Sequence, residues 1–204
     1  MVDHQQHWEG VYSSKERDQV SWFQPHAASS LRLIRNCTDQ QAHVIDVGGG
    51  ASTLVDGLLD AGYRHVTVLD LAESALAASR ARLGERAQTV QWIAADITRA
   101  SLPAAQYDVW HDRAVFHFLT DPADRARYVA QVLKSVKPGG HVIVATFGPD
   151  GPLQCSGLDV MRYAPDALHA EFGAPFRLLG HETEIHQTPA GKEQEFVYCY
   201  CVRT

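Results

Sequence analysis

Short apolar runs alternate with helix-like segments from residue 42 to about residue 147, and this alternation constrains the fold more than any other feature. Strands and helices in this order are typical of βαβ units, which build a parallel sheet with helices on its faces. Three of the five runs are almost continuously apolar, as expected for strands that are covered on both sides. The strands that we predict here are 43–47, 65–69, 89–94, 107–110 and 141–147.

The segments between these strands carry helix signals. In the longest of them, Asp121 supplies an N-terminal cap and Pro122 occupies the first helical position. The Pro-Gly-Gly at 138–140 predicts a turn before the fifth strand. The helices that we predict in this region cover about 54–62, 72–83 and 122–136. Ser52 or Thr53 is the expected cap of the first helix.

The chain changes character on both sides of this region. Residues 1–24 are rich in aromatic side chains, and a helix is predicted from Pro25 to about Asn36. Residues 148–163 predict a long insertion, and a short helix over 165–172 and two strands over 176–185 and 196–202 follow it. The predicted fold is therefore α/β: a Rossmann-like, doubly wound, seven-stranded sheet, mostly parallel, with a C-terminal antiparallel hairpin.

Composition limits the partners that such a chain can have. Its 204 residues fit a single domain, and a net charge of -6 argues against broad binding to nucleic acid phosphates. No apolar run approaches the roughly 20 residues that span a bilayer, and the N-terminus lacks a signal pattern. We therefore expect a cytoplasmic protein with neither nucleic acid nor membrane as partner. Its four cysteines are expected to be free thiols.

Gly48, Gly49 and Gly50 directly follow the first predicted strand. Glycines let the backbone approach a ligand closely, and the start of the next helix offers free N–H groups. Asp70 ends the second strand 20 residues after Gly50, and its carboxylate can accept hydrogen bonds from both hydroxyls of a ribose. The combination indicates an adenosine-containing ligand, although a tight strand–helix turn alone would also need these glycines.

The residues around the glycines favour S-adenosylmethionine (SAM) over a dinucleotide. A dinucleotide site needs a third glycine beside the pyrophosphate, and Thr53 stands in that place. Asp46, two residues before the glycines, would repel a pyrophosphate but suits the ammonium and sulfonium of SAM. Asp96 ends the third strand, where it can accept a hydrogen bond from an adenine amino group or, alternatively, cap its own loop.

Over about residues 40–148 the sequence resembles the class I, seven-stranded SAM-dependent methyltransferases. The resemblance implies that Gly48 and Gly50 lie against the methionine portion of SAM, that Asp70 binds the ribose and that Asp96 binds adenine. Ser52 stands where the family often has a further glycine. The segments that carry the resemblance are 44–50, 68–70, 95–97, 107–110 and 133–140. The remaining candidates for contact with SAM are Asp46, Gly49, Leu71 and Ile97.

The aromatic N-terminal segment resembles the lid of one branch of this family, which includes some protein lysine methyltransferases and thiopurine-type enzymes. The resemblance implies that Trp8, Tyr12 and Trp22 fold over the cofactor. A lid excludes water, and aromatic faces attract a cation such as a sulfonium. The alternative is plain aromatic packing on the sheet edge.

We divide the single domain 1–204 into a lid and helix (1–36), a SAM-binding core (42–148), and an insertion with the hairpin (149–204).

His111, Asp112 and Arg113 follow the fourth strand, at the sheet edge where ligands bind in such folds. Thiopurine-type enzymes have an Asp-Arg pair at a similar place, so the resemblance implies catalytic or substrate-side roles for these residues. Arg113 can bind a carboxylate or phosphate of the acceptor. The alternative is a structural Asp112–Arg113 ion pair with His111 as a helix cap.

The predicted function is methyl transfer from SAM to a small-molecule acceptor by direct displacement, with S-adenosylhomocysteine (SAH) as product. The residues after the fourth strand differ from the Asp-Lys-Gly-Thr pattern of lysine methyltransferases in this branch, which favours a small acceptor, a thiol or other soft nucleophile among the candidates. The alternatives are a protein lysine N-methyltransferase, an NAD-dependent oxidoreductase and a non-catalytic SAM-binding protein. No metal site is predicted, and the oligomeric state stays open.

Overall fold

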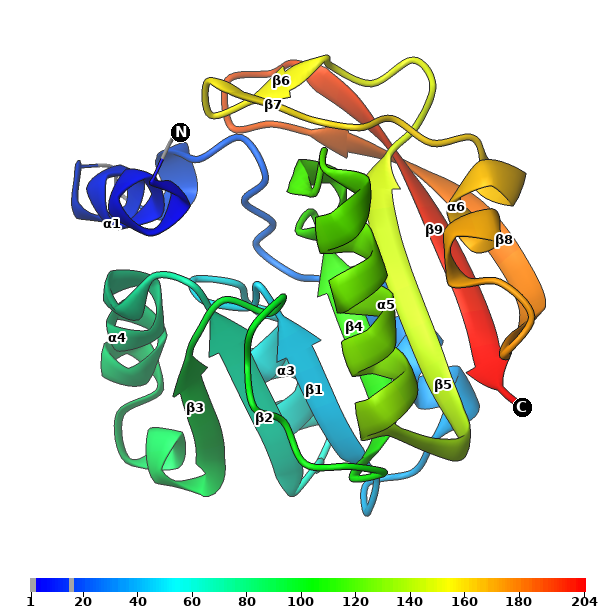
Figure 1. The fold of residues 1–204 in the computed structure, drawn as a ribbon. Coiled ribbons are helices and arrows are strands. Elements are labelled where there is room, and N and C mark those ends of the chain that lie inside the picture. The colour runs from blue at the N-terminus through cyan, green and yellow to red at the C-terminus, as the bar shows by residue number, and fades with distance from the viewer. Residues whose placement is uncertain (1–2, 15–16) are drawn as a thin grey trace.

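A computed structural model describes residues 3–14 and 17–204 and confirms the predicted seven-stranded sheet (Figure 1). Its strands are β1 (His43–Val47), β2 (His65–Asp70), β3 (Val90–Ala94), β4 (Tyr107–Arg113), β5 (Val136–Phe147), β8 (Phe176–Gln187) and β9 (Glu193–Arg203). They lie in the order β3-β2-β1-β4-β5-β9-β8. The first five strands are parallel, whereas β9 runs antiparallel to both β5 and β8. The C-terminal hairpin thus extends the same sheet.

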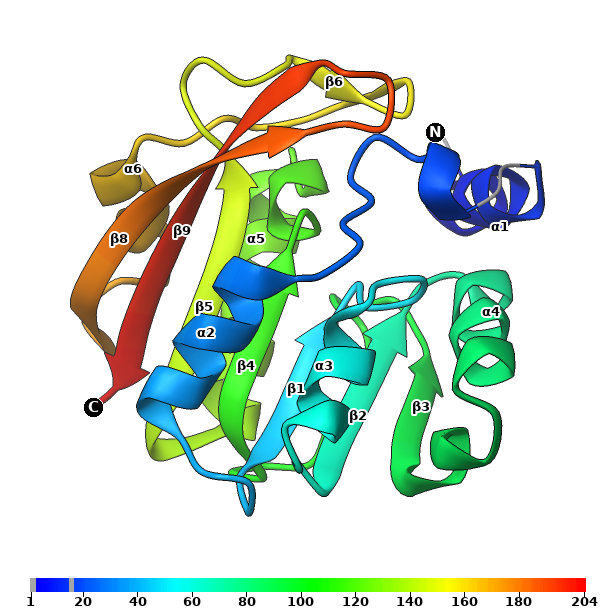
Figure 2. The ribbon, with the colours of Figure 1, turned by 180° about the vertical axis from the view of Figure 1, so that it is seen from behind.

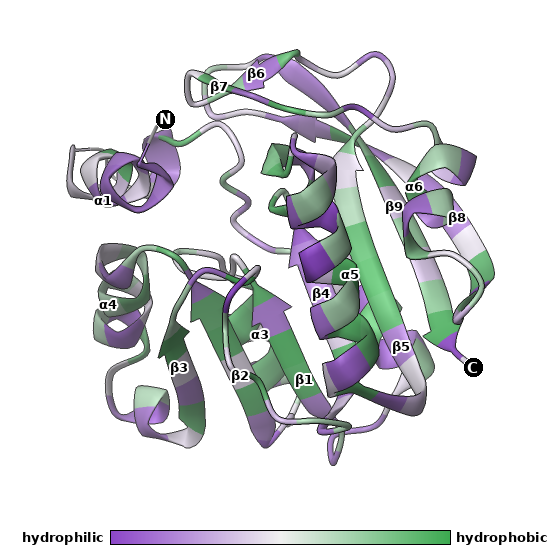
Figure 3. Cartoon of the chain, in the orientation of Figure 1, coloured by the Kyte–Doolittle hydropathy of each residue, from purple (hydrophilic) through white to green (hydrophobic). Residues whose placement is uncertain are grey.

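Helices cover both faces of the sheet, which confirms the doubly wound arrangement (Figures 1 and 2). One face carries α2 (Ala28–Cys37), α3 (Leu54–Asp60) and α4 (Glu73–Leu83), and the other carries α5 (Pro122–Ser135) and α6 (Pro165–Phe172). The hydropathy colouring shows apolar strands between helices whose outward residues are polar (Figure 3). Burial on both faces explains why the central strands are almost continuously apolar.

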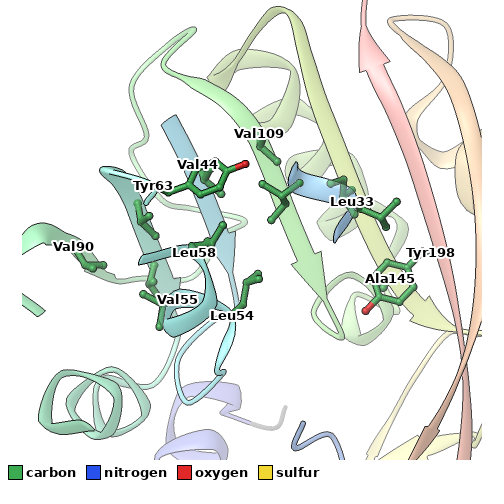
Figure 4. Packing of buried hydrophobic residues seen from close by; sticks show 14 of the residues in the cluster. Leu33, Val44, Leu54, Val55, Leu58, Tyr63, Val90, Val109, Ala145 and Tyr198 are labelled. Atoms are coloured by element: carbon green, nitrogen blue, oxygen red, sulfur yellow. The ribbon is translucent and has the colours of Figure 1, made fainter. Parts of the chain in front are cut away.

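Each face has its own hydrophobic core. In the first, Val44 and Val109 of neighbouring strands pack against Leu54, Val55 and Leu58 of α3 (Figure 4). The second core packs the opposite side of the same strands against α5 and α6. Successive strand side chains point to opposite faces, so each central strand supplies both cores.

Capping signals define several of the helix ends. The Asp121 carboxylate accepts from the Ala123 N–H at 2.8 Å, with Pro122 in the first turn of α5, and Gly84 ends α4 at a φ of 60°. At α3 the Ser52 hydroxyl accepts from the Leu54 N–H (3.1 Å), whereas the Thr53 hydroxyl donates to the Gln24 carbonyl instead (3.0 Å). Thr53 therefore ties the N-terminal segment to the glycine turn.

The helix predicted from Pro25 begins only at Ala28, and the fourth strand continues to Arg113. Two further segments differ from the prediction. The Pro-Gly-Gly at 138–140 lies within β5, whose pairing with β4 shifts register there, because Gly139 at a φ of 78° bends the strand without ending it. The predicted insertion contains a small hairpin, β6 (Gln154–Cys155) and β7 (Leu158–Asp159). Its turn residues Ser156 and Gly157 both have positive φ, as tight two-residue hairpins require.

The N-terminal helix α1 (His4–Ser14) lies beside α4 at the carboxyl end of the parallel strands (Figure 1). The described part of the chain also contains three short 3₁₀ helices, at Arg17–Gln19, Gly84–Thr89 and Phe116–Phe118. Residues 1–2 and 15–16 of the predicted N-terminal lid lie outside the described residues. Within residues 3–14 and 17–204, no helix is both long and apolar enough to cross a membrane.

Candidate active site

The site lies where the strand order reverses, between β1 and β4. The connections from β1 lead to β2 and β3 on one side, and those from β4 lead to β5 on the other, which leaves a crevice at the carboxyl ends of β1 and β4. A pocket opens at this point, with a cavity of about 50 Å³. Its lining residues come from the N-terminal segment, α2, β1, the glycine turn and β4, and include Tyr12, Trp22, Ser30, Asp46, Gly48, Gly49, His111 and Arg113.

The glycine turn packs directly against two carboxylates. A Cβ on Gly49 would stand 2.3 Å from Asp46 Oδ2, and a Cβ on Gly50 would stand 2.5 Å from Asp70 Oδ2. Gly48 has a φ of 71°, where a side chain would also collide with Val115. The turn therefore needs glycine at all three positions, because the backbone itself fills the space beside the two acids.

Asp70 is buried at the end of β2, and its two carboxylate oxygens face the turn. Oδ2 accepts from the Gly50 N–H (3.0 Å) and Oδ1 accepts from the Ala72 N–H (2.9 Å). Burial raises the pKa of Asp70 to about 6, although the hydrogen bonds from Ala72 and Gly50 oppose this shift. Each oxygen retains acceptor capacity, because a carboxylate oxygen can accept two hydrogen bonds.

Aromatic side chains gather over this end of the sheet. Trp8 lies edge-on to Trp22 (ring centroids 5.5 Å apart) and to Phe118 (5.1 Å), and Tyr12 lies 6.2 Å from both Trp8 and Trp22. Trp8 and Tyr12 pack on the small residues Ala51, Ala72 and Ala75 of the glycine turn and α4. The three aromatic residues named from the sequence therefore form one cluster with Phe118, which sequence reasoning did not assign to it.

A carboxylate holds α1 in this position. The two Glu9 oxygens accept from the N–H groups of Glu73 (2.7 Å) and Ser74 (3.2 Å) at the start of α4. These groups have no partner within the helix, so a negative charge is favourable there. Hydrogen bonds from Ser74 and Glu73 at the start of α4 lower the pKa of Glu9. The contact fixes the aromatic cluster over the carboxyl end of the sheet.

A chain of buried side chains crosses the pocket floor. Asp46 and His111 face each other in register on β1 and β4, and Asp46 Oδ1 lies 2.7 Å from His111 Nδ1. His111 Nε2 lies 2.8 Å from the Ser30 hydroxyl, which is 3.2 Å from the Tyr198 hydroxyl. Arg113 Nε donates to Tyr198 at 3.1 Å. Asp46, His111, Ser30 and Tyr198 are at most 3% exposed.

Arg113 is fully engaged within the protein. Its guanidinium pairs with Glu184 Oε1 at 3.0 Å and lies 3.9 Å above the Phe196 ring. It also donates to the Trp22 carbonyl (3.4 Å), and Gln24 donates to the same Glu184 oxygen (3.0 Å). Arg113 therefore links residues 22–24 to β8 and β9. The Asp112–Arg113 ion pair considered from the sequence is wrong, because Glu184 is the partner.

Asp112 is buried and does not line the pocket, because successive residues of β4 point to opposite faces. Its carboxylate accepts from the N–H groups of Val115 (2.9 Å) and Phe116 (3.1 Å) and from the Tyr128 hydroxyl (2.6 Å). Burial raises its pKa to about 6. The structure thus brings His111 and Arg113 together at the pocket and leaves Asp112 behind the strand, where it holds the turn after β4.

The remaining candidates follow β2 and β3. Asp96 Oδ1 accepts from the N–H and hydroxyl of Thr98 (2.8 and 2.7 Å), and Oδ2 lies 3.8 Å from Arg99. This is the local cap considered above, and it leaves the half-exposed carboxylate within reach of solvent. Leu71 is partly buried beside Asp70, and Ile97 is buried in the core that faces α5. The described residues contain no cluster of three or more His, Cys, Asp or Glu side chains suited to a metal ion.

Sequence reasoning missed Ser30, Tyr198, Glu184 and Gln24. They come from α2, β9, β8 and the N-terminal segment, which lie far apart in the chain and carry no motif. They meet because β9 pairs with β5 and because α2 packs on the face to which His111 points. Only the strand order supplies this information.

Comparisons with known proteins agree with this geometry. A protein-family model described as a methyltransferase domain matches residues 44–140. The eEF1A lysine and N-terminal methyltransferase of Danio rerio is 22% identical over 147 residues, which cover 71% of this chain and 21% of that protein. The ubiquinone/menaquinone biosynthesis C-methyltransferase UbiE of Roseobacter denitrificans is 28% identical over 141 residues, which cover 68% of this chain and 50% of that protein. The match thus spans at most half the length of these relatives.

A solved structure shares the fold over the whole chain. The Burkholderia thailandensis 1,6-didemethyltoxoflavin-N1-methyltransferase, with bound 1,6-didemethyltoxoflavin and SAH, superposes with a TM-score of 0.73 at 19% identity. The superposition covers 100% of this chain and 91% of that one. The chain is thus similar to a methyltransferase domain over residues 44–140, and its fold resembles that of an SAH-bound methyltransferase.

Proposed function

We propose that the chain transfers the methyl group of SAM to an uncharged small molecule held between the glycine turn and residues 20–24. The residues at the crevice fit SAM. The glycine turn is a cradle that a single Cβ would fill, and Asp70 offers a buried carboxylate for the ribose hydroxyls. Asp46 Oδ2 is buried and makes no hydrogen bond with any described residue, so this oxygen can accept a hydrogen bond from the ammonium of SAM. When bound, SAM supplies an electrophilic methyl group, and the protein needs mainly to align it.

The aromatic cluster supports a lid over this cofactor. Trp8 and Tyr12 pack on the same three alanines that border the glycine turn and the start of α4. Apolar faces there exclude water, and an aromatic ring attracts a sulfonium. We assign the chain to the lid-bearing branch on this basis. Asp96, Leu71 and Ile97 are placed at the adenine end by the same proposal.

A small acceptor is favoured by the way in which the pocket is covered. Residues 22–24 cross it and are tied down on two sides, by Thr53 at the glycine turn and by Arg113 and Glu184 at β4 and β8. A protein acceptor needs an open groove for its backbone, whereas a small molecule can be enclosed. The relative UbiE and the toxoflavin enzyme carry names of small-molecule methyltransferases, but the eEF1A enzyme acts on a protein.

Calorimetry tests the cofactor assignment. We expect SAH to bind with a micromolar Kd and NADH to give no heat. Labelled SAM then tests the acceptor in two matched panels, one of small thiols, amines and carboxylates and one of lysine-containing peptides. Label in the peptides alone would favour the protein lysine methyltransferase, and NADH binding without SAH binding would overturn the proposal.

The pH dependence of SAH binding provides a second check. Only the ionised Asp70 carboxylate can accept from both ribose hydroxyls, and its pKa is raised to about 6. Binding is therefore expected at neutral pH and lost as the pH falls through about 6, so the Kd should rise about tenfold between pH 7 and pH 5. Titration of SAH at pH 5, 6 and 7 measures this change. A constant Kd would contradict the role of Asp70.

A further inference from the structure

The buried side chains across the pocket floor form a hydrogen-bonded chain with one direction. Arg113 Nε can only donate, so the Tyr198 oxygen accepts from it. Among the described residues, the other partner of the Tyr198 hydroxyl is the Ser30 hydroxyl, so the Tyr198 proton points to Ser30. The Ser30 proton then points to His111 Nε2, and His111 Nδ1–H donates to Asp46. This assignment gives a partner to the hydroxyl protons of Tyr198 and Ser30 and to both ring nitrogens of His111, as buried polar groups require.

The sheet register explains how these residues meet. Asp46 and His111 are direct partners on β1 and β4. Arg113, Ala145 and Tyr198 occupy one row across β4, β5 and β9, and the small side chain of Ala145 lets the guanidinium reach across β5 to Tyr198. The opposite tautomer of His111, with a proton on Nε2, would leave the Ser30 proton without an acceptor.

We propose that Ser30 and His111 form a relay that accepts the proton of the methyl acceptor, with Asp46, Tyr198 and Arg113 as positioning residues. This inference rests on the function proposed above. The order Asp–His–Ser, at 2.7 and 2.8 Å, is the arrangement in which a histidine accepts the proton of a serine while a carboxylate fixes its tautomer. Here the serine passes a proton on, because Ser30 is buried, lines the pocket and receives its own hydrogen bond from Tyr198.

The transfer is balanced in atoms and charge. The nucleophilic atom of the acceptor gains a bond to the methyl carbon while the carbon–sulfur bond breaks, and that electron pair stays on sulfur. The acceptor's proton passes to the Ser30 oxygen as the Ser30 proton passes to His111 Nε2. The positive charge lost from sulfur thus reappears on the imidazolium, next to the Asp46 carboxylate.

The relay defines the class of acceptor as an uncharged protic nucleophile, that is, a thiol, a hydroxyl or an N–H group. A carboxylate has no proton to give at neutral pH, and a phosphate is largely ionised there. Either anion would also find no free cation among the described residues that line the pocket, because Glu184 neutralises Arg113 and the Asp46 carboxylate adds a negative charge. The anion-binding role expected for Arg113 from the sequence is therefore not part of the proposal.

The tautomer of His111 tests the relay without any acceptor. In the SAH-saturated protein, nitrogen-15 NMR of labelled histidines should show His111, identified by its loss in His111→Asn, neutral and protonated on Nδ1. Ser30→Ala should leave this tautomer in place, whereas Asp46→Asn should shift it toward Nε2–H, because the amide can donate to Nδ1. If His111 of the wild-type protein is protonated on Nε2, this nitrogen cannot accept the proton of Ser30, and the relay is overturned.

Two thiol probes of similar size test proton transfer itself. Phenylmethanethiol carries its proton at neutral pH, whereas 4-nitrothiophenol is already ionised. With labelled SAM, we expect His111→Asn and Ser30→Ala to slow methylation of phenylmethanethiol by about 10²–10⁴-fold and that of 4-nitrothiophenol by less than about threefold. The exposed His181 supplies the matched control, His181→Asn, which should change neither rate.

The outcomes separate this inference from the proposed function. Equal losses with both thiols would show that His111 and Ser30 only maintain the fold, which overturns the relay while methyl transfer stands. If the wild-type protein binds SAH but methylates neither thiol, the tautomer of His111 measured by NMR decides whether the relay stands. A protein that fails to bind SAH in calorimetry refutes the proposed function itself.

Discussion

Replacing Asp70 with alanine is expected to weaken SAH binding by about 10²–10³-fold, the largest loss of affinity that we expect from a single side chain of the site. The Asp70 carboxylate can accept from both ribose hydroxyls, and hydrogen bonds to a charged group contribute about 1.5–3 kcal/mol each. The substitution also removes the acceptor of the Gly50 and Ala72 N–H groups, so the glycine turn loses its support.

Calorimetry with SAH measures this effect, and urea unfolding shows whether the variant remains folded. The matched control is Asp60→Ala, which removes an exposed carboxylate paired with Arg86 on the surface. Exposed ion pairs contribute about 0–1 kcal/mol, so this control should keep the SAH affinity of the wild type. An Asp70→Ala protein that is folded and binds SAH within threefold of the wild type would refute the assignment of the ribose to Asp70.

Replacing Asp112 with alanine is expected to lower the free energy of unfolding by about 3–5 kcal/mol, the largest stability effect that we predict. The substitution leaves three buried donors without their acceptor, namely the N–H groups of Val115 and Phe116 and the Tyr128 hydroxyl. Each unsatisfied buried group costs about 1–3 kcal/mol, with partial relaxation reducing the sum. The turn after β4 should loosen as a result.

Urea unfolding of Asp112→Ala and Asp112→Asn measures this loss. The asparagine variant keeps one carbonyl acceptor, so its loss of stability should be about half as large. The position of Asp112 behind β4 predicts that the asparagine variant, where folded, still binds SAH and methylates its acceptor at a rate within tenfold of the wild type. A stable variant that has lost methyl transfer would instead place Asp112 in the catalytic machinery, as the resemblance to thiopurine-type enzymes first implied.

Local sequence signals were sufficient for most of the fold. The five parallel strands, α5 with its Asp121 cap and the end of α4 at Gly84 follow from short-range preferences that tertiary contacts reinforce. The local signals gave a wrong prediction where one residue is compatible with two backbone conformations. Gly139 allows a turn or a bend within a strand, and continued pairing of β5 with β4 and β9 selected the bend.

The candidate site divides in the same way. The glycine turn and Asp70 lie within 23 residues of one another along β1, α3 and β2, so a short motif is sufficient to predict their meeting. His111 and Arg113 were expected after the fourth strand and are among the last residues of β4, but their partners could not be predicted. Arg113 pairs with Glu184, 71 residues away, and Ser30 meets His111 across 81 residues.

The sequence by itself determined the class of fold, the position of the glycine turn and the residues beside it, because these depend on strands and turns that are close in the chain. Only the tertiary structure decided which partners His111 and Arg113 have and that Asp112 faces away from the pocket. The physical reason is that β9 inserts beside β5 while α2 packs over β4, and neither pairing is encoded in any local pattern.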